Sequence, residues 1–425
     1  MAASPYRVLL RSAAVRWQAL GGLLAQTTQG AGAIGVILVI RGHHGSLALA
    51  GAVVGAVSVA GGLARPVQGR FIDRRGPRGL MAATGIVHPA AVIAIVALSD
   101  ARAPGAVLVA VGVLAGASLP PVSTCMRVAW GAASGDGDRT SAYSLVYLTQ
   151  ELAILAGPLL LSAVVAASNP SAALVAVAAV TGAGTLGFSA SLAPDLGRSA
   201  SPRERGPTLL SAPGMRALLP TAGLVGAVIG GVEVGVPTFA TAHHAPAASG
   251  LLIAVLSMGG IVGAALYGAR RWRRAPPVRL LMFLAALTVA AALTIAAPGL
   301  ILLGMVLPLV GLALNPSLST ISLLVDSHVP ASSAAEAFGW LSTGIAGGAG
   351  LSSAVAGAIS HPGHPRPAFV VAAVAAAAAT VLAAATRKKL GAVAQPVERD
   401  IEDVLDLRGL DALDLRDPPD HLDDL

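Results

Sequence analysis

Charged side chains are scarce in this sequence. They make up 12% of the 425 residues, against about 25% in an average soluble domain. Hydrophobic residues account for 55% and aromatic residues for only 3%, and the mean hydropathy is +0.76. This composition excludes an ordinary soluble enzyme and indicates a membrane protein.

Cysteine is nearly absent, since Cys125 is the only one. One thiol excludes a disulfide framework and leaves no thiol cluster for a metal, so neither a metal site nor a bound cofactor is expected. The sequence also lacks the Gly-x-x-x-x-Gly-Lys-Ser/Thr element that cradles nucleotide phosphates, and direct use of ATP is therefore not indicated.

What the sequence does contain is a series of apolar runs of roughly 20 residues, the length that spans a bilayer. The runs are continuous and rich in Ala, Leu, Val and Gly, whereas a transmembrane β-barrel needs short segments of alternating polarity. Helices are the only spanning structure left. Twelve spans are predicted, at residues 18–40, 46–64, 79–98, 104–126, 142–166, 171–192, 218–239, 248–267, 280–297, 300–324, 335–359 and 368–385.

The distribution of Lys and Arg predicts how the chain crosses the cell membrane. Counted on alternate sides of the spans, 25 basic residues fall on the side of the N-terminus and 3 on the other, namely Arg41, Arg102 and Arg366. Basic loops stay cytoplasmic, so both termini are expected there, with lipid headgroups rather than nucleic acid beside the basic residues. The 26 Arg against 2 Lys are typical of a GC-rich bacterial genome, which predicts a bacterial inner membrane.

The spans divide into two sets of six. We predict a cytoplasmic N-terminus at residues 1–17, an N-terminal six-helix bundle at 18–193, a cytoplasmic linker at 194–216, a C-terminal six-helix bundle at 217–387 and a tail at 388–425. The tail holds 11 of the 21 acidic residues and only 5 basic ones, a composition that favours disorder. A monomer is expected.

The two halves carry an internal repeat. Gly116-Ala-Ser-Leu-Pro-Pro121 in the fourth span matches Gly311-Leu-Ala-Leu-Asn-Pro316 in the tenth. Tyr147-Leu-Thr149 in the fifth span matches Trp340-Leu-Ser342 in the eleventh. Duplicated six-helix halves are typical of transporters, in which the substrate site lies between the halves near the middle of the membrane.

The segment between the second and third spans reads Gly69-Arg-Phe-Ile-Asp73-Arg74-Arg-Gly76-Pro-Arg78. It resembles the loop motif Gly-x-x-x-Asp-Arg-x-Gly-x-Arg of the major facilitator superfamily and stands in the same loop. A degenerate copy without the acid starts at Gly268, and Pro77 departs from the motif, where the family usually has a basic residue. The resemblance covers residues 11–387.

This resemblance implies a fold and a set of gating residues. The fold is an all-α polytopic membrane protein in which twelve transmembrane helices form two pseudo-symmetric six-helix bundles. In the family, the acid of this loop and an arginine of the fourth span help to hold the cytoplasmic gate. Without the resemblance, the residues alone indicate a basic loop in which Asp73 can reach the N-terminus of a neighbouring helix. The gating candidates are Gly69, Asp73, Arg74, Gly76, Arg78 and, in the fourth span, Arg127.

Two carboxyl groups lie deep within predicted spans. Glu151 is close to the middle of the fifth span, and Glu233 is nearer the outer end of the seventh. An ionisable group is costly in a membrane and is by default a functional candidate, here a proton site or a substrate contact; a hydrogen bond between helices is the structural alternative. Polar amides add Gln26 and Gln29 in the first span and Asn315 in the tenth, either as cavity residues or as interhelical contacts.

The leading hypothesis is a secondary active transporter that moves a small, partly hydrophobic molecule by alternating access, with a proton gradient driving efflux. Gly157-Pro158 in the fifth span is similar to an element of the exporter branch of the superfamily. A permease for a sugar or another metabolite is the alternative within transport. Outside transport, the alternatives are a membrane receptor or scaffold and a multispan enzyme, and an enzyme is expected to show clustered catalytic residues or large outer loops.

Overall fold

The computed structural model describes residues 5–43, 45–134, 139–193, 196, 213–360 and 364–391. These residues belong to one compact unit that ends at Gly391. Most of the predicted linker lies outside the described residues, and so does the predicted acidic tail beyond Gly391.

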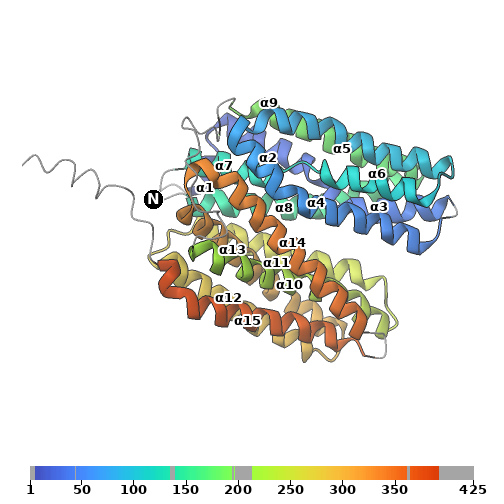
Figure 1. Cartoon of the computed structure of the whole chain (residues 1–425). Coiled ribbons are helices and arrows are strands. Elements are labelled where there is room, and N and C mark those ends of the chain that lie inside the picture. The colour runs from blue at the N-terminus through green and yellow to red at the C-terminus, as the bar shows by residue number, and fades with distance from the viewer. Residues whose placement is uncertain are drawn as a thin grey trace, which may run out of the picture. The chain divides into compact units, whose positions relative to one another are not determined.

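The described residues are almost entirely α-helical, which confirms the predicted fold class (Figure 1). Several helices begin with proline, as at Pro77 and Pro170, and Asn169 caps the helix that Pro170 begins. Proline costs no hydrogen bond at this position, because the first N–H groups of a helix have no partner within the helix. The helices are α1 Pro5–Leu9, α2 Ala13–Ala25, α3 Thr27–Gly42, α4 Leu47–Arg75, α5 Pro77–Asp100, α6 Gly105–Ala117, α7 Val122–Ala133, α8 Arg139–Ala167, α9 Pro170–Ser191, α10 Pro213–Ala242, α11 Ala248–Ala269, α12 Pro276–Ile295, α13 Leu300–His328, α14 Ala334–Ile359 and α15 Arg366–Gly391.

Eleven helical segments in the described part of the chain are long and apolar enough to cross a membrane, and they match eleven predicted spans. The remaining predicted span is α14, which has 26 residues but carries enough Gly and Ser to lower its hydropathy. Two spans are broken helices. The first span consists of α2 and α3, which meet at Gln26, and the fourth consists of α6 and α7, which are separated by Ser118-Leu119-Pro120-Pro121.

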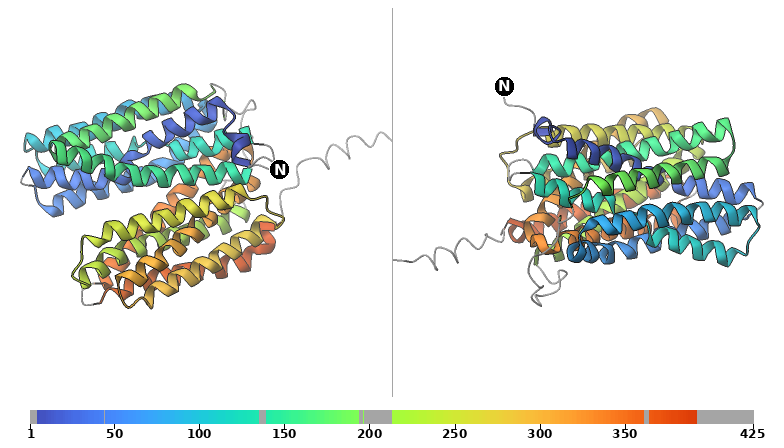
Figure 2. Two further views of the ribbon diagram at one scale, coloured as in Figure 1. Left: turned by 180° about the vertical axis from the view of Figure 1, so that it is seen from behind. Right: turned by 90° about the horizontal axis from the view of Figure 1, so that it is seen from above.

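The helices pack into an N-terminal bundle, α2 to α9, and a C-terminal bundle, α10 to α15, which Figures 1 and 2 show in blue to green and in yellow-green to red. The packing repeats between the bundles: α4 packs on α6 as α11 packs on α13, and α5 packs on α9 as α12 packs on α15. Large aliphatic side chains such as Leu63, Leu159 and Ile301 remain 68%, 64% and 80% exposed, as expected of a protein surrounded by lipid.

The second span is longer than predicted, because α4 continues to Arg75 instead of ending at residue 64. Most of the predicted loop motif is therefore helical, and only Gly76, with a φ of 81°, interrupts the chain before α5. Pro66 does not end the helix. The carbonyl of Gly62, which loses its helical partner at Pro66, instead accepts a hydrogen bond from Thr343 Oγ1 on α14 (2.7 Å).

Two other predicted boundaries also shift. The helix α10 begins at Pro213, inside the segment that we predicted as linker, because Pro is well tolerated in a first helical turn. The last helix, α15, continues to Gly391 and so includes Lys388 and Lys389, which we had placed in the tail. Basic side chains in a last turn are favourable, since the C-terminal end of a helix carries partial negative charge.

Candidate functional site

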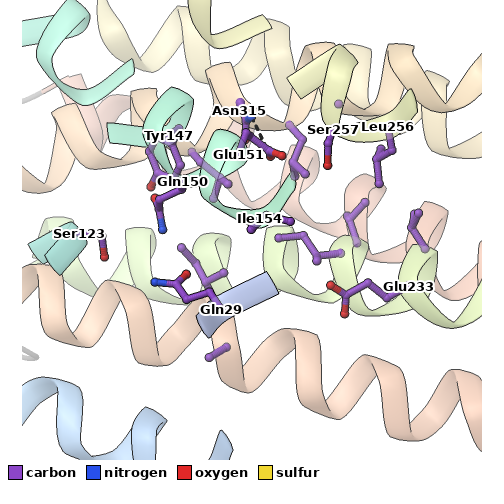
Figure 3. Close-up of a pocket in the computed structure, with 18 of the residues that line it drawn as sticks. Gln29, Ser123, Tyr147, Gln150, Glu151, Ile154, Glu233, Leu256, Ser257 and Asn315 are labelled. Carbon is purple, nitrogen blue, oxygen red and sulfur yellow. Dashed lines mark hydrogen bonds between the residues drawn. The ribbon is translucent and has the colours of Figure 1, made fainter. Parts of the chain in front are cut away.

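A cavity of about 360 Å³ lies between the two bundles. It is bordered by α3, α4, α7 and α8 on one side and by α10, α11, α13 and α14 on the other, and Figure 3 shows its lining. Most of the wall is apolar, with a limited set of polar groups, as is usual for small-molecule sites. These polar residues are Gln29, Arg65, Ser123, Arg127, Tyr147, Gln150, Glu151, Glu233, Ser257, Asn315 and Ser342.

A second cavity, of about 510 Å³, adjoins the first. It extends between α3, α4, α5 and α14, and five residues line both cavities: Gln29, Arg65, Glu233, Ser342 and Ala346. His88 of α5 lies in its wall. The Nδ1 of this imidazole is 2.8 Å from the carbonyl oxygen of Ala115, and its Nε2 has no hydrogen-bond partner.

Glu151 joins the two bundles at the cavity wall. Its Oε1 accepts a hydrogen bond from Nδ2 of Asn315 on α13 (3.0 Å), as the dashed line in Figure 3 shows. The contact needs a glycine at position 260 of α11, because a Cβ there would lie 2.6 Å from Asn315 Nδ2 and 3.0 Å from Glu151 Oε1. Two residues predicted separately from the fifth and tenth spans thus form one polar pair.

Glu233 is exposed to the cavities and has no hydrogen bond or ion pair with another described residue. It lies on α10, which stays helical from Pro213 to Ala242 despite its glycines and Pro237. In Figure 3, Glu233 and Ser123 lie at opposite ends of the view, with Glu151 between them. The cavity therefore contains two carboxyl groups that differ in their partners.

The two predicted amides of the first span have different surroundings. Gln29 lines both cavities. Gln26 is 1% exposed and lies at the α2–α3 break, where its Nε2 donates to the carbonyl of Gly22 (2.9 Å). Because Gln26 lines neither cavity, its contacts are those of a structural residue of the N-terminal bundle.

Asp73 connects the bundles at the end where α4 stops and α14 starts, which we name the gate end. Its Oδ1 and Oδ2 accept hydrogen bonds from the backbone N–H groups of Ala335 (3.0 Å) and Glu336 (2.9 Å). A carboxylate is favourable there, because the first turn of a helix carries free N–H groups and partial positive charge. The sequence predicted this kind of contact without identifying the partner helix.

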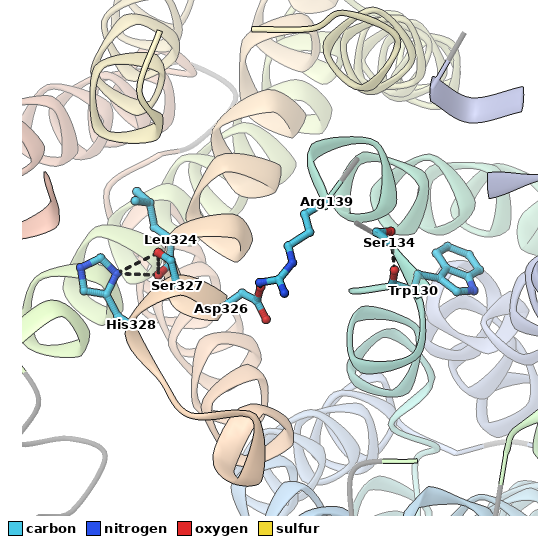
Figure 4. Close-up of polar contacts among 7 residues, drawn as sticks. All are labelled: Trp130, Ser134, Arg139, Leu324, Asp326, Ser327 and His328. Atoms are coloured by element: carbon cyan, nitrogen blue, oxygen red, sulfur yellow. Dashed lines mark hydrogen bonds and ion pairs between the residues drawn. The ribbon is translucent and has the colours of Figure 1, made fainter. Parts of the chain in front are cut away.

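Ion pairs reinforce the gate end. Arg70 Nε lies 2.7 Å from Glu336 Oε1, and Arg139 Nη1 lies 2.7 Å from Asp326 Oδ2, a pair that Figure 4 shows between α8 and α13. Tyr6 of α1 donates to the carbonyl of Ala264 (2.7 Å). Burial raises the pKa of the Tyr6 phenol, which keeps it protonated as a donor.

The remaining gating candidates surround this contact. A Cβ at Gly69 would collide with the carbonyl of Ala335, so this glycine permits the close crossing of α4 and α14. Gly76 supplies the left-handed turn, and Arg74 and Arg78 are exposed. Among the described residues, the inter-bundle hydrogen bond of α4 farthest from the gate end is that between Gly62 and Thr343.

Arg127 lies in the cavity wall rather than beside Asp73. Its Nη2 donates to the hydroxyl of Tyr147 (3.0 Å), which in turn lies 3.0 Å from Ser322 Oγ on α13. The guanidinium also sits over the ring of Phe338, 5.7 Å from its centroid. Whether Arg127 acts on the gate stays a prediction, because its direct contacts are with the cavity wall and the opposite bundle.

Sequence reasoning missed two charged or titratable residues of the cavities. The prediction ended the second span at residue 64 and therefore left Arg65 outside it, among the basic residues of the cytoplasmic side. His88 was overlooked, although a His-Pro pair within an apolar span was a usable signal, since titratable residues inside a membrane are rare.

The contact between Asp73 and the N-terminus of α14 leads to a first prediction. We expect Asp73→Asn to weaken the closed gate by about 1 to 3 kcal/mol, because an amide removes the charge that stabilises the N-terminus of α14. The reporter is a single cysteine at Ser144, a buried position of α8, in a Cys125→Ser background. Labelling by a membrane-impermeant thiol reagent should become faster. Labelling at the parent rate, with normal turnover, would leave Asp73 a topological role only.

The fold and the site together define a class of protein: a duplicated helical membrane protein with a polar cavity between its halves, which is the architecture of secondary transporters. The model of the Major Facilitator Superfamily matches residues 19–351, and the chain belongs to this family. Membership of this family means that it is a multi-pass membrane protein and a transporter of small molecules. No curated protein sequence gives a significant match.

Solved structures share the fold at low sequence identity. A bacterial homologue of the iron transporter ferroportin, in its outward-facing state, is 15% identical, with a TM-score of 0.73 over 87% of this chain and 98% of the other. The human organic anion transporter MFSD10 is 17% identical, with a TM-score of 0.67 over 90% and 100%. The transporter FucP, in the outward conformation, is 11% identical, with a TM-score of 0.68 over 87% and 97%.

Proposed function

We propose that this transporter couples the movement of protons to the efflux of a small, partly hydrophobic molecule across a bacterial inner membrane. The observation that carries the proposal is the pair of carboxyl groups, Glu151 and Glu233, in a cavity between the bundles. Neither forms an ion pair with an Arg or Lys of the described residues, so each is free to change its protonation state.

The geometry supports a division of roles. Glu151 contacts both bundles through Asn315, so its protonation can favour one arrangement of the bundles over the other. Glu233 faces both cavities and has no partner in the described part of the chain, a position better suited to contacting substrate. We take the ion-paired gate end as the cytoplasmic end, as predicted, and the structure as the outward-facing state of the proposed cycle.

A permease for a metabolite remains the second candidate, and the observation that favours it is the polar content of the wall. Gln29, Gln150 and Ser342 are hydrogen-bonding groups that an exporter of purely apolar compounds does not need. In either case we propose a protein that works as a monomer, with both termini in the cytoplasm and the proton gradient as the only energy source.

One experiment separates these proposals. A growth-inhibition panel with and without expression identifies compounds that the protein removes, and each is then tested in proteoliposomes that contain a pH-sensitive dye. We expect each protected compound to exchange for protons, so that protons flow down an imposed pH gradient only while the compound is transported. Compounds that cross the membrane at the same rate with and without the gradient would contradict proton coupling, and protection against none of them would favour the permease.

A further inference from the structure

Arg127 is buried in the cavity wall with most of its hydrogen-bonding capacity unused. The residue is 2% exposed, and only Nη2 has a partner, the hydroxyl of Tyr147. Its Nε and Nη1 have no hydrogen-bond partner, and no carboxylate of the described residues pairs with it. A guanidinium does not lose its proton in proteins, so the buried charge lacks a counter-ion.

Arg65 brings a second positive charge to the same wall. Its Nη1 donates to the carbonyl of Pro120 (3.0 Å) and lies 3.4 Å from that of Leu119, so the helix break between α6 and α7 fixes the side chain. Arg65 on α4 and Arg127 on α7 line the same cavity. Two cations held in a water-poor wall create a strong local attraction for an anion.

The same break adds a helix N-terminus. The 12-residue helix α7 begins at Val122, directly after Pro121, and no side chain caps it. Ser123, in its first turn, lines the cavity. Free N–H groups and the helix dipole at such a point favour a negative group, and the uncompensated guanidinium of Arg127 lies on this same helix.

The architecture does not require either arginine. When the fourth span is aligned with the tenth through their repeated motif, Arg127 corresponds to Ser322. When the loop motif at Gly69 is aligned with its degenerate copy at Gly268, Arg65 corresponds to Ala264. The arginines therefore break the repeat, whereas a purely structural role at the bundle interface would be needed in both halves. The carboxyl groups of the cavity do not neutralise them, because neither forms an ion pair with Arg65 or Arg127.

We propose that the cavity binds its substrate by a carboxylate group, held between Arg65, Arg127 and the first turn of α7. The flat guanidinium offers paired N–H groups that match the two oxygens of a carboxylate. Apolar side chains such as Ile154, Val232 and Leu256 contact the rest of an amphipathic organic acid. This inference deepens the proposed function and rests on it for the transport of the bound acid.

The test measures binding to the purified full-length protein, not transport. The probes are 4-phenylbutyrate and its uncharged amide, with a panel of other aryl and alkyl carboxylates and their amides, and the readout is ligand-induced thermal stabilisation as a function of concentration. We expect the parent protein to bind the carboxylates and not the amides. Arg127→Gln and, independently, the less buried Arg65→Gln should each weaken carboxylate binding by about tenfold or more. Arg127→Lys should restore part of it.

The matched control is Arg41→Gln, which removes an exposed arginine at the end of α3 and should bind as the parent does. Amides that bind as well as carboxylates, carboxylate binding that survives both glutamine variants, or binding of no carboxylate would each overturn the site. The proposed function fails separately. Arginine-dependent binding without proton movement in proteoliposomes would refute coupling and keep the site, whereas proton-coupled movement of uncharged compounds alone would refute the site and keep coupling.

Discussion

Glu151→Gln is expected to abolish pH-driven transport while the protein still folds and binds substrate. The glutamine oxygen can still accept the hydrogen bond from Asn315 Nδ2, so the contact between α8 and α13 survives. What the variant loses is the ability to gain and release a proton inside the membrane. The measurement is accumulation in proteoliposomes with and without an imposed pH gradient, using a compound from the growth panel.

Glu233→Gln is the matched comparison, because it removes a carboxyl group from the same cavity at a position that has no partner among the described residues. We expect it to change the apparent affinity more than the response to the pH gradient. If Glu151→Gln accumulates substrate as the parent does, the assignment of Glu151 is wrong. Gly260→Ala provides a second approach: the new methyl group would displace the Asn315 amide and crowd the Glu151 carboxyl group, and coupling should fall although both polar residues remain.

Gly69→Leu is expected to prevent closure of the gate end. A side chain at this position collides with the backbone of Ala335 and Glu336, which cannot move aside as the tip of a flexible side chain can. Overpacking at well-packed contacts costs about 1 to 3 kcal/mol, and here it acts on the interface between bundles, not on the core of either. The cysteine reporter at Ser144 should therefore react about fivefold to a hundredfold faster than in the parent, because each 1.4 kcal/mol is a factor of ten.

Gly55→Leu is the control for this variant. Gly55 lies on the same helix, α4, and a Cβ there meets no atom within 4 Å. The substitution therefore adds the same side chain without a collision, and labelling at Ser144 should remain slow. Equal labelling in the two variants would show that the close crossing of α4 and α14 does not hold the gate.

Much of the fold could be predicted because it depends on properties that repeat along the chain. Apolar length and charge placement located the spans, and the match of Gly116–Pro121 with Gly311–Pro316 predicted two equivalent halves. Both are confirmed, since packing of α4 on α6 is repeated by packing of α11 on α13. Glu151, Glu233, Gln29 and Asn315 line the cavity because polar groups in an apolar span have few other stable positions.

The rest could not be predicted, because it depends on contacts between segments that are distant in sequence. Nothing near Pro66 reveals that Thr343 satisfies the carbonyl that this proline leaves free, so the helix appeared to end and Arg65 appeared to be in a loop. The backbone partners of Asp73 are more than 260 residues away. Gln26 and Gln29 looked equivalent, and only the break between α2 and α3 separates the buried amide from the cavity amide.

The central claim is that the two bundles alternate between closure at the gate end and closure at the opposite end. Distances between paired spin labels on α4 and α14 test it most directly, because these two helices cross and run the length of the bundles. In a Cys125→Ser background, one pair is Arg74→Cys with Ala331→Cys, in the short turn just before α14, at the gate end. The other pair is Ala48→Cys with Ala358→Cys at the opposite end, and all four positions are exposed. We expect that a change from alkaline to acidic buffer, or Gly69→Leu, shifts the two distance distributions in opposite directions. Distributions that stay fixed, or that lengthen together at both ends, would contradict alternating access.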